Sequence, residues 1–444
     1  MWRSLRVIWL FLVLGSSYGV QWALSRVLGE RVEARWERVH ERNAARLARA
    51  FTRLRGIFIK LGQVLSVLGG FLPRAYGREL EQLQDEVPAR PFSEMKARLQ
   101  DEFGPGALSR FESFSEQPLA AASLAQVHEA TTKDGRRVAV KLLYPGIRGL
   151  IRRDLATIRF LLPVIRRLVL VSRIDRVLDQ LEAMLGRETD YDNERKNIER
   201  MRAVFADMPK VVIPEVIGEL SGKSVLTMSF ETGSKITDRQ GHEALDLTAN
   251  EIASLLVECY FRMLFSARIF HADPHPGNFL VRRDGGELRL VILDHGAVEE
   301  VTSALASGMQ QVVLGALTRS DDQILLGLET MGFVAPGGDR ELLGSVGKEY
   351  LGVLSKMRIK DFSKLDQAAV VKLAGFDQIR GRLRELMRHI EYPEGYFYVE
   401  RTLVLLFGLV GQLAPREGLP GLVAPFANQA FLALSTPLAP PPAR

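Results

Sequence analysis

The chain has 444 residues and a formal net charge of +6; 47% of its residues are hydrophobic and 25% are charged. These values are typical of a globular protein, and the length allows two or three domains. The single cysteine, Cys259, excludes an internal disulfide framework. Its apolar neighbours in the sequence indicate a buried core thiol rather than a catalytic nucleophile.

The N-terminal segment is apolar enough to enter a membrane. The 19 residues between Arg6 and Arg26 carry no charge. A helix of that length extends about 28 Å, close to the thickness of the hydrocarbon core of a bilayer. Trp9 and Trp22 lie near its two ends, where aromatic residues meet the membrane interface. We predict a membrane anchor over residues 1–27, with a cleaved signal peptide as the alternative.

Arginine is dense in two stretches of helical periodicity, Arg31–Lys60 and Arg148–Arg176. Two interpretations of these stretches are open: a solvated helix face, or a surface that faces acidic lipids. The sequence has no aromatic interleaving and no groove-reading motif, so nucleic acid is not an expected partner.

The segment that follows the anchor is predicted to be helical. Apolar residues at three- and four-residue spacing indicate one or more long amphipathic helices from Val32 to Leu68. A further helix is expected over Ser93–Phe103, with Ser93 as its N-cap and Gly104 at its end. We assign residues 28–115 to this helical extension.

Residues 116–232 are predicted to form a small, sheet-rich lobe. The expected strands, in two pairs, are Val127–Thr131 with Val138–Leu142, and Val211–Ile217 with Ser224–Ser229. Asp134-Gly135 is the hairpin turn of the first pair. Helical periodicity fills the interval between the pairs, from about Ile147 to Ala206.

Residues 233–415 are predicted to form a larger, helical lobe. Its one expected hairpin joins Phe279–Arg282 to Leu288–Leu293. The apolar run Arg401–Val410 is short, and we interpret it as a core helix rather than a membrane segment. Residues 416–444 are assigned to a Pro- and Ala-rich tail, whose end, Thr436–Arg444, is predicted to be disordered. The predicted fold class is therefore α+β, with a small β-rich N-lobe and a helical C-lobe after the helical extension and the membrane anchor.

The motifs of the second lobe fit phosphoryl transfer from a Mg²⁺-bound nucleotide. The segment His271-Ala-Asp-Pro-His-Pro-Gly-Asn278 has the residue types and spacing of a kinase catalytic loop. In such a loop Asp273 would orient or deprotonate the attacking group, and Asn278 would bind a metal ion. Asp294-His-Gly296 follows a predicted strand and stands where kinases carry Asp-Phe-Gly, so Asp294 is the second predicted metal ligand.

The first lobe supplies a candidate cation for the phosphates. Lys141 ends the string Val138-Ala-Val-Lys141 on the strand after the first hairpin, which is the position of the phosphate-binding lysine in kinases. Such a lysine needs an acidic partner, because a buried charge is costly unless it is paired. Glu188 and Glu194 both follow on a helical stretch, and either is a candidate partner from the residues alone.

A transition-metal site in a hydrolase is the rival interpretation of the same loop. Its ligands would be His271, Asp273, His275 and His295. Pro274 and Pro276 exclude a helix, so two histidines one helical turn apart are not available here. This interpretation also leaves Lys141 and Asn278 without roles. We therefore favour the nucleotide site.

Seven strings occur in order along the chain, and together they carry a family resemblance. They are Lys60-Leu-Gly-Gln63, Leu83-Gln-Asp-Glu-Val-Pro88, Ala120-Ala-Ala-Ser-Leu-Ala-Gln-Val-His128, Val138-Ala-Val-Lys141, Glu188-Thr-Asp-Tyr191, His271 to Asn278, and Asp294-His-Gly296. The set resembles the UbiB/ABC1/ADCK family of atypical kinases, also described as AarF domain-containing kinase-like proteins. The resemblance covers about Phe51 to Pro415.

The resemblance implies a two-lobed, atypical protein-kinase-like fold whose nucleotide pocket is partly closed by the helical extension. It implies that Lys60 reaches into the active site and meets Glu188 and Asp190. It also implies that Lys141 pairs with Glu194. ATP or ADP and Mg²⁺ are the implied cofactors.

Two further nucleotide-binding segments follow from the resemblance. Ala120, Ala121, Ala122 and Ser123 stand where a kinase has its glycine-rich, phosphate-covering loop. Alone, an alanine-rich segment predicts a helix, whereas the resemblance implies a loop over the nucleotide. Met228 and Phe230 stand at the implied hinge, around Ser229, where family members usually carry an acidic residue.

The resemblance also implies a function. It favours a membrane-associated, Mg²⁺-dependent ATPase or small-molecule kinase that supports ubiquinone (isoprenoid quinone) biosynthesis or membrane lipid homeostasis. The expected partners are membrane lipids, quinone precursors or quinone-biosynthesis proteins. We expect an uncleaved anchor in a bacterial inner membrane with the kinase-like domain in the cytoplasm, because export would separate that domain from ATP. A nucleotide-binding pseudokinase scaffold and a protein kinase are the alternatives.

Overall fold

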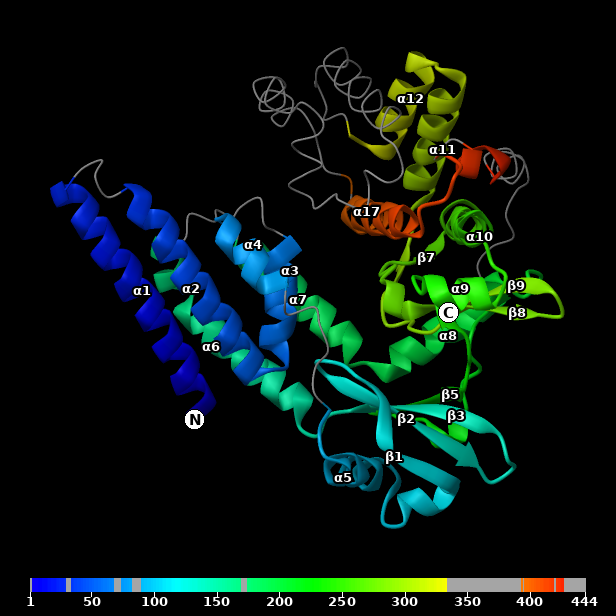
Figure 1. Cartoon of the computed structure of the whole chain (residues 1–444), viewed down its shortest axis with the longest axis horizontal. Helices are drawn as coiled ribbons and strands as arrows, with labels where there is room; N and C mark the ends of the chain where they lie inside the picture. Colours follow the sequence, from blue (N-terminus) through cyan, green and yellow to red (C-terminus); the bar gives the residue numbers. More distant parts are fainter. Residues whose placement is uncertain are drawn as a thin grey trace. The chain divides into compact units, whose positions relative to one another are not determined.

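The computed structural model describes residues 2–28, 33–67, 73–81, 89–168, 174–333, 393, 395–418 and 421–426 (Figure 1). The chain divides into two compact units. The first comprises Met1–Arg195 and Glu215–Phe230, and the second comprises Lys196–Pro214 and Glu231–Arg444. The family-like string at Leu83–Pro88 and the end of the tail, 427–444, lie outside the described residues.

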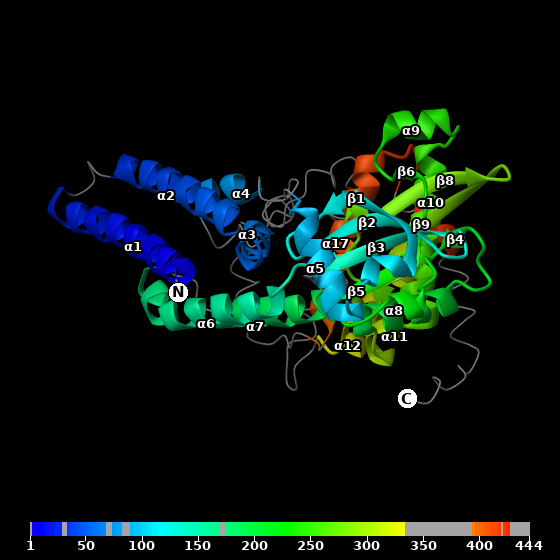
Figure 2. The same ribbon diagram turned by 90° about the horizontal axis from the view of Figure 1, so that it is seen from below.

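The first unit opens with the helices α1 (Trp2–Leu28), α2 (Glu33–Leu54), α3 (Ile57–Val67) and α4 (Arg74–Glu81). A long helix from later in the chain, α6 (Ile147–Leu168), packs beside them. Helix α1 lies along both α2 and α6, as Figures 1 and 2 show from two directions. By length and composition α1 could cross a membrane. The predicted extension, 28–115, is thus mainly helical in its described part, but the prediction is wrong at its end, where a strand begins at Phe111.

A sharp corner separates α2 from α3. Arg55 and Gly56 both have left-handed backbone conformations, with φ of 54° and 59°. Gly56 adopts this conformation without strain because it has no Cβ. The next two residues, Ile57 and Phe58, are completely buried, so packing fixes the direction in which α3 leaves the corner.

The sheet of the first unit is antiparallel and four-stranded, in the order β1-β2-β3-β5. Its strands are β1 (Phe111–Ala121), β2 (Ala125–Thr132), β3 (Arg137–Leu143) and β5 (Val225–Ser229). The predicted Asp134-Gly135 hairpin is confirmed, and Gly135 has the positive φ of 84° that the turn requires. Strand β1 was not predicted as a strand; its irregular pairing with β2 contains register shifts around Pro118.

Helices flank this sheet in the sequence. Helix α5 (Phe92–Phe103) ends at Gly104 as predicted, but Pro91 is its N-cap, so the predicted N-cap Ser93 is wrong. Proline is suited to a helix start because its φ is fixed and it lacks an N–H that would need a partner. The long helical stretch predicted after Ile147 consists of α6, α7 (Ile174–Glu188) and α8 (Tyr191–Val204).

The second unit contains two small sheets and several helices. One sheet has the order β4-β9-β8-β6, and the other pairs β10 with β7. The strands are β4 (Val211–Val212), β6 (Ser234–Lys235), β7 (Ile269–His271), β8 (Phe279–Asp284), β9 (Glu287–Ile292) and β10 (Val298–Glu300). The helices are α9 (Arg239–Ala244), α10 (Ala249–Phe261), α11 (Ser303–Thr318), α12 (Asp321–Met331) and α17 (Tyr396–Leu413). The predicted hairpin is confirmed as β8 and β9.

The second predicted strand pair is confirmed only in part. β4 pairs in parallel with β9, whereas β5 pairs with β3. The two segments meet at an antiparallel bridge between Val216 and Met228, where the N–H of Ile217 donates to the carbonyl of Thr227 and the N–H of Ser229 donates to that of Glu215, both at 2.8 Å. Pro214 lies between β4 and this bridge and has no N–H to donate, so a continuous ladder is interrupted there.

The apolar run Arg401–Val410 lies within α17. This helix packs against α10 and buries Val399, Leu406, Leu409 and Val410 in the second unit. Its described environment is that of a core helix, in agreement with the interpretation from the sequence.

Candidate active site

Lys141 lies on β3 and forms an ion pair with Glu194 of α8. Its Nζ is 2.7 Å from Oε1 and 3.0 Å from Oε2 of that carboxylate. Only 1% of the Glu194 side chain is exposed, and 17% of the Lys141 side chain. The ring of Tyr191 lies beside the ammonium group, 5.4 Å from ring centroid to Nζ. The structure therefore pairs Lys141 with Glu194, not with Glu188.

Asp190 begins the helix that carries this carboxylate. Its Oδ1 accepts a hydrogen bond of 3.1 Å from the backbone N–H of Asn193, as an N-cap residue does. The preceding carbonyl, that of Thr189, accepts hydrogen bonds from the guanidinium group of Arg148. Asp190 thus helps to fix the start of α8, and its predicted contact with nucleotide stays a prediction.

Lys60 lies on α3 and pairs with Glu188 at the end of α7. Its Nζ is 2.5 Å from Oε1 of Glu188, and both side chains are partly exposed. Exposed pairs stabilise a fold by at most about 1 kcal/mol. The pair is therefore a positional link between α3 and α7 more than a source of stability. It brings together two of the residues that the resemblance placed in the active site.

The alanine-rich segment is a hairpin, not a helix. Ala120 is in register with Val127, and Ala121 with Gln126. The backbone N–H of Ala122 donates to the carbonyl of Ala125 at 2.8 Å, which closes the turn that contains Ser123. Pairing with β2 overrides the helix propensity of alanine here. The segment lies where a phosphate-covering loop would lie in the strand order.

Behind this hairpin, Gln126 and His128 form a buried polar network. The backbone N–H of Arg90 donates to Gln126 Oε1 at 3.0 Å. His128 Nδ1 lies 2.8 Å from the carbonyl of Ser115, and its Nε2 lies 2.9 Å from Gln126 Nε2. The carbonyl can only accept, so Nδ1 carries the proton and Nε2 accepts from the amide. Burial lowers the pKa of His128, in agreement with a neutral ring.

The two predicted hinge residues lie at the end of β5. Met228 is buried and is in register with Ala139 of β3. Phe230 donates its backbone N–H to the carbonyl of Arg137, whose guanidinium group lies 4.3 Å from the centroid of the Phe230 ring. Strand β5 is thus held to β3 beyond its last ladder pair.

In the second unit, the predicted catalytic loop follows β7. The backbone of Asn278 donates to the carbonyl of His275 at 2.9 Å, and His275 Nδ1 accepts from the N–H of Gly277 at 3.1 Å. Asn278 Nδ2 donates to the main-chain oxygen of Asp273 at 3.0 Å. The amide oxygen of Asn278 is therefore turned away from that carbonyl and can serve as a metal ligand.

Arg401 was not predicted as a site residue. Its guanidinium group lies 3.1 Å from Asp273 Oδ1, although the two residues are 128 positions apart in the sequence. Thr402, the next residue of α17, donates to the carbonyl of Ala272 at 3.2 Å. The only signal in the sequence was an arginine at the head of an apolar run. α17 thus holds the loop that carries Asp273.

The β8–β9 hairpin brings the two predicted metal ligands together. The backbone N–H of Leu293 donates to the carbonyl of Asn278 at 2.9 Å. The residue directly before Asp294 is therefore hydrogen-bonded to Asn278. Asp294 Oδ1 accepts from the N–H of Gly296 at 2.9 Å. A carboxylate held in this turn is a hard oxygen ligand of the kind that binds Mg²⁺.

Two buried histidines support the Asp294 turn from behind. His271 Nε2 lies 2.5 Å from the carbonyl of Asp294, so this nitrogen donates. The His271 and His295 rings meet edge to face, with centroids 6.0 Å apart. Asn197 of α8, which was not predicted, donates to the carbonyl of His295 at 3.0 Å. These contacts position the backbone on both sides of Asp294.

These residues fit Mg²⁺ better than a transition metal. An amide oxygen and a carboxylate are hard ligands of the kind that Mg²⁺ prefers. Among the residues that the structure describes, no three of His, Cys, Asp or Glu are grouped as a metal site. One of the two ring nitrogens of His271, Nε2, donates to a backbone carbonyl and so does not offer a lone pair to a transition metal.

Cys259 takes no part in these contacts. It is completely buried in α10, and burial raises the pKa of its thiol. A raised pKa disfavours the reactive thiolate. The neighbouring Tyr260 donates its hydroxyl to the carbonyl of His271 at 3.0 Å. The position of Cys259 is that of a core residue, as the sequence indicated.

The motifs and the fold agree with a comparison against known families. The model of the ABC1 atypical kinase-like domain matches residues 82–326, which is more than half of the chain. The chain belongs to the ABC1 atypical kinase-like family. The predicted UbiB/ABC1/ADCK membership is thereby confirmed, and so is the α+β, kinase-like fold class.

Several ABC1-family relatives are similar over much of the chain. AarF domain-containing protein kinase 1 of Xenopus tropicalis is 33% identical over 64% of this chain and 57% of its own. An uncharacterized Synechocystis protein is 31% identical over 88% of this chain and 68% of its own. Protein ACTIVITY OF BC1 COMPLEX KINASE 8, chloroplastic, of Arabidopsis thaliana is 27% identical over 90% of this chain and 54% of its own. The chain thus spans little more than half the length of the kinase-named relatives.

A solved structure supports the fold over most of the chain. Rv3197 from Mycobacterium tuberculosis, determined as a complex with erythromycin, superposes with a TM-score of 0.57 at 26% sequence identity. The match covers 83% of this chain and 92% of that one. The fold of this ABC1-family chain is therefore one that occurs in a solved protein.

Proposed function

We propose that this ABC1-family chain binds Mg-ATP and cleaves its γ-phosphoryl group, as an atypical kinase or ATPase. The observation that carries the proposal is the ion pair between Lys141 and the almost completely buried Glu194. A fold gains little from a buried ion pair compared with apolar packing, so such a pair is better explained by a need for an oriented ammonium group. In kinases a lysine at this place binds the α- and β-phosphates.

Each remaining part of the chemistry has a residue in the second unit. Mg²⁺, held by Asn278 and Asp294, would neutralise charge on the phosphate oxygens. Asp273 orients the attacking hydroxyl or water and accepts its proton while the bond to the bridging oxygen breaks and ADP leaves. Arg401 holds Oδ1 of Asp273 at 3.1 Å, so it orients this carboxylate.

The pair of Lys60 and Glu188 supports a restrained activity. Lys60 comes from the helical extension, and its contact with Glu188 ties that extension to the end of α7, two residues before the N-cap of α8. We infer that the extension limits access of a protein substrate and favours water or a small molecule as acceptor. Transfer of labelled phosphate to a protein in trans would instead favour the protein-kinase alternative.

We further propose that the activity serves isoprenoid quinone biosynthesis or membrane lipid homeostasis at a bacterial inner membrane, with the kinase-like part in the cytoplasm. The support is the family membership and the apolar α1, which is long enough to anchor a protein. Deletion of the gene should change quinone or phospholipid pools, and the parent chain should restore them whereas Asp294→Asn should not.

The direct test compares ATP hydrolysis by the parent chain with that of Asp294→Asn, in the presence of Mg²⁺ and lipid vesicles. We expect a loss of about a hundredfold or more, because metal-held charge is a main source of stabilisation of the transition state. Asp284→Asn is the matched control, since Asp284 ends β8 at the turn of the same hairpin, away from Asp294, and pairs with Arg282. If Asp294→Asn hydrolyses ATP as fast as the control, the assigned site is wrong.

A pseudokinase scaffold remains the second candidate. It would bind nucleotide without turnover, and its buried Lys141–Glu194 pair would serve binding alone. Mg-ATP binding by the parent chain with no hydrolysis, even with vesicles present, would favour the scaffold over the enzyme.

A further inference from the structure

Helix α1 has its apolar side chains on the outside. Of the eleven large apolar residues that are exposed in the described part of the chain, seven lie on α1. They are Trp2, Leu5, Trp9, Leu12, Val20, Trp22 and Val27, and we call them the outer face of α1. The first four recur at three- and four-residue spacing, which places them along one side of the helix. Exposure of 77% for Trp2 and 68% for Trp9 shows that little else covers this side.

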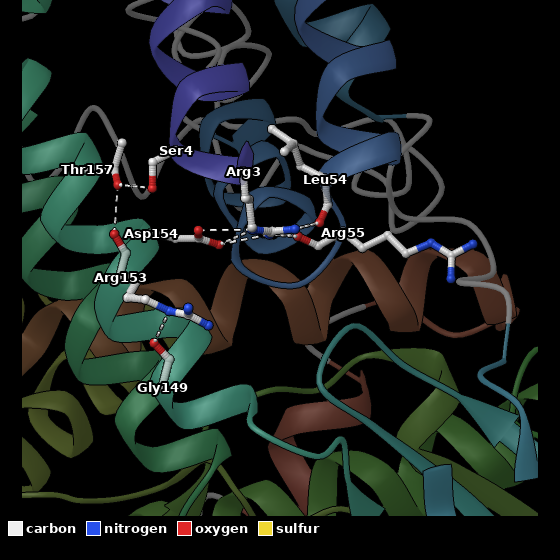
Figure 3. Close-up of polar contacts among 8 residues, drawn as sticks. All are labelled: Arg3, Ser4, Leu54, Arg55, Gly149, Arg153, Asp154 and Thr157. Carbon is white, nitrogen blue, oxygen red and sulfur yellow. Dashed lines mark hydrogen bonds and ion pairs between the residues drawn. The ribbon is translucent and has the colours of Figure 1, made fainter. Parts of the chain in front are cut away.

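The inner face of α1 is polar at its beginning. Arg3 Nε lies 2.9 Å from an oxygen of Asp154 on α6, whose side chain is only 2% exposed (Figure 3). The same guanidinium group donates to the carbonyls of Leu54 and Arg55 at the corner between α2 and α3. Thr157 donates to the hydroxyl of Ser4 one turn further along α6, at 3.2 Å. These contacts connect α1 to α2, to α6 and to the corner that precedes α3.

The inner face is also polar in the second half of α1. Asn43 of α2 donates to the hydroxyl of Ser17 at 3.1 Å. The hydroxyl of Tyr18 lies 2.9 Å from His40 Nδ1 and 2.7 Å from the hydroxyl of Tyr76 on α4. Polar contacts therefore hold α1 to its neighbours near both ends.

This polarity opposes release of α1 from the extension. If α1 left, Asp154 would lose its bidentate contact with Arg3, and both charged groups would have to be hydrated instead. While α1 stays in place, it cannot cross a bilayer by itself, because its neighbour α2 exposes charged residues to the surroundings. These include Arg35, Glu37, Arg38, Glu41 and Arg42. Such a helix is expensive to bury in hydrocarbon.

The charges of α1 favour an acidic partner. The helix has no aspartate or glutamate, and Arg6 and Arg26 are exposed. The guanidinium group of Arg26 lies 4.0 Å from the centroid of the Trp22 ring. Tryptophan prefers the headgroup region of a membrane, and arginine extends toward phosphate from the edge of an apolar surface.

We propose that the outer face of α1 binds the surface of an anionic bilayer, with α1 lying in the membrane plane and still packed on α2 and α6. An in-plane helix places its apolar side among the acyl-chain ends and its basic residues at the headgroups. This inference goes beyond the proposed enzymatic function and does not depend on nucleotide binding. Asp294→Asn should therefore bind vesicles as the parent does.

The first test measures sedimentation of the full chain with vesicles of phosphatidylglycerol and phosphatidylcholine in equal parts. We expect Trp9→Asp with Leu12→Asp to weaken binding by about tenfold or more, since apolar area on the outer face supplies the affinity. Leu326→Asp is the matched control, because Leu326 is an exposed leucine of α12 in the other unit. Equal binding by both variants would overturn the proposal, as would equal binding of the parent to vesicles of phosphatidylcholine alone.

The second test asks whether α1 stays docked. Ser17→Cys with Asn43→Cys replaces a pair of side chains in hydrogen-bonding contact, so oxidation should lock α1 to α2. We expect the oxidised and the reduced forms to bind vesicles equally. Loss of binding on oxidation would show that α1 leaves the extension to enter the membrane, and would overturn the in-plane arrangement. If the chain self-associates and added vesicles do not reduce this self-association, the outer face of α1 binds a second copy of the chain instead of a membrane.

Discussion

At the scale of single residues, the buried carboxylate of Glu194 makes it possible to distinguish an effect of Lys141 on stability from its effect on ATP hydrolysis. Lys141→Met removes the ammonium group from this carboxylate, and we expect it to lower the free energy of unfolding by about 3–5 kcal/mol. The double variant Lys141→Met with Glu194→Gln removes both charges and should regain most of that stability. It should still lack ATP hydrolysis, because the ammonium group proposed to bind the α- and β-phosphates is missing.

Urea unfolding and ATP hydrolysis, measured on the single and the double variant, check this prediction. Full hydrolysis by the double variant would show that Lys141 does not bind phosphate. A double variant no more stable than Lys141→Met would show that the two charges are not coupled.

His128 gives a second prediction, on pH dependence. Burial lowers its pKa in the folded chain below the unfolded value of about 6.5. Below that pH the unfolded state takes up a proton that the folded state resists, so stability is fully present above pH 6.5 and is lost as the pH falls. We expect His128→Asn, which cannot titrate, to be less stable at neutral pH but to lose less stability on acidification.

The measurement is the free energy of unfolding of both proteins at several values roughly between pH 5 and pH 7.5. The difference in slope between parent and variant isolates His128 from other groups, such as His40, whose pKa burial also lowers. Parallel curves for the two proteins would refute the assignment.

At the scale of elements, glycine sets how closely α11 and α12 approach. A Cβ at Gly327 would lie 2.6 Å from the carbonyl oxygen of Gly308 and 2.8 Å from the backbone nitrogen of Val312. Neither is the end of a flexible side chain, so the helices would have to separate. We expect Gly327→Ala to cost about 1–3 kcal/mol of stability.

Gly408 of α17 provides the control for this prediction. A Cβ there would meet nothing within 4 Å, so Gly408→Ala should be neutral or stabilise the chain by up to about 1 kcal/mol through helix propensity. Thermal or urea unfolding of both variants compares them. Equal effects of the two substitutions would show that the close approach of α11 and α12 does not limit stability.

Some helices, strands and turns could be predicted from local sequence patterns alone. The turns at Asp134-Gly135 and Gly285-Gly286 were predicted because glycine tolerates the left-handed conformations that hairpin turns need. Strand β1 escaped prediction because its alanine-rich end has helix propensity and its pairing with β2 is irregular. The partners of β4 and β5 could not be predicted either, since strand pairing between distant segments depends on tertiary packing.

At the scale of the whole molecule, ligand binding should stabilise the fold. Because a ligand that binds only the folded chain stabilises it, Mg-ATP is expected to raise the unfolding temperature of the full chain. A ligand at a hundred times its dissociation constant adds about 2.7 kcal/mol. Chelation of Mg²⁺ should remove most of this gain, and Asp294→Asn should show little of it.

Thermal unfolding with ATP, with and without excess chelator, is the measurement, and Asp284→Asn is the control variant. A gain that persists in the chelator would show that nucleotide binds without the metal. That result would question the roles of Asn278 and Asp294 while leaving the role of Lys141 intact.

The sequence by itself determined the chemistry of the candidate site. Lys141, Asp273, Asn278 and Asp294 were found from residue type, short spacing and order along the chain, all of which are local properties. The tertiary structure decided the partners: Glu194 rather than Glu188 for Lys141, and Arg401 for Asp273. It also decided which side of α1 is exposed, since an apolar segment does not reveal what packs against it. The physical reason is that side-chain chemistry belongs to each residue, whereas pairing and burial depend on contacts between segments far apart in the chain.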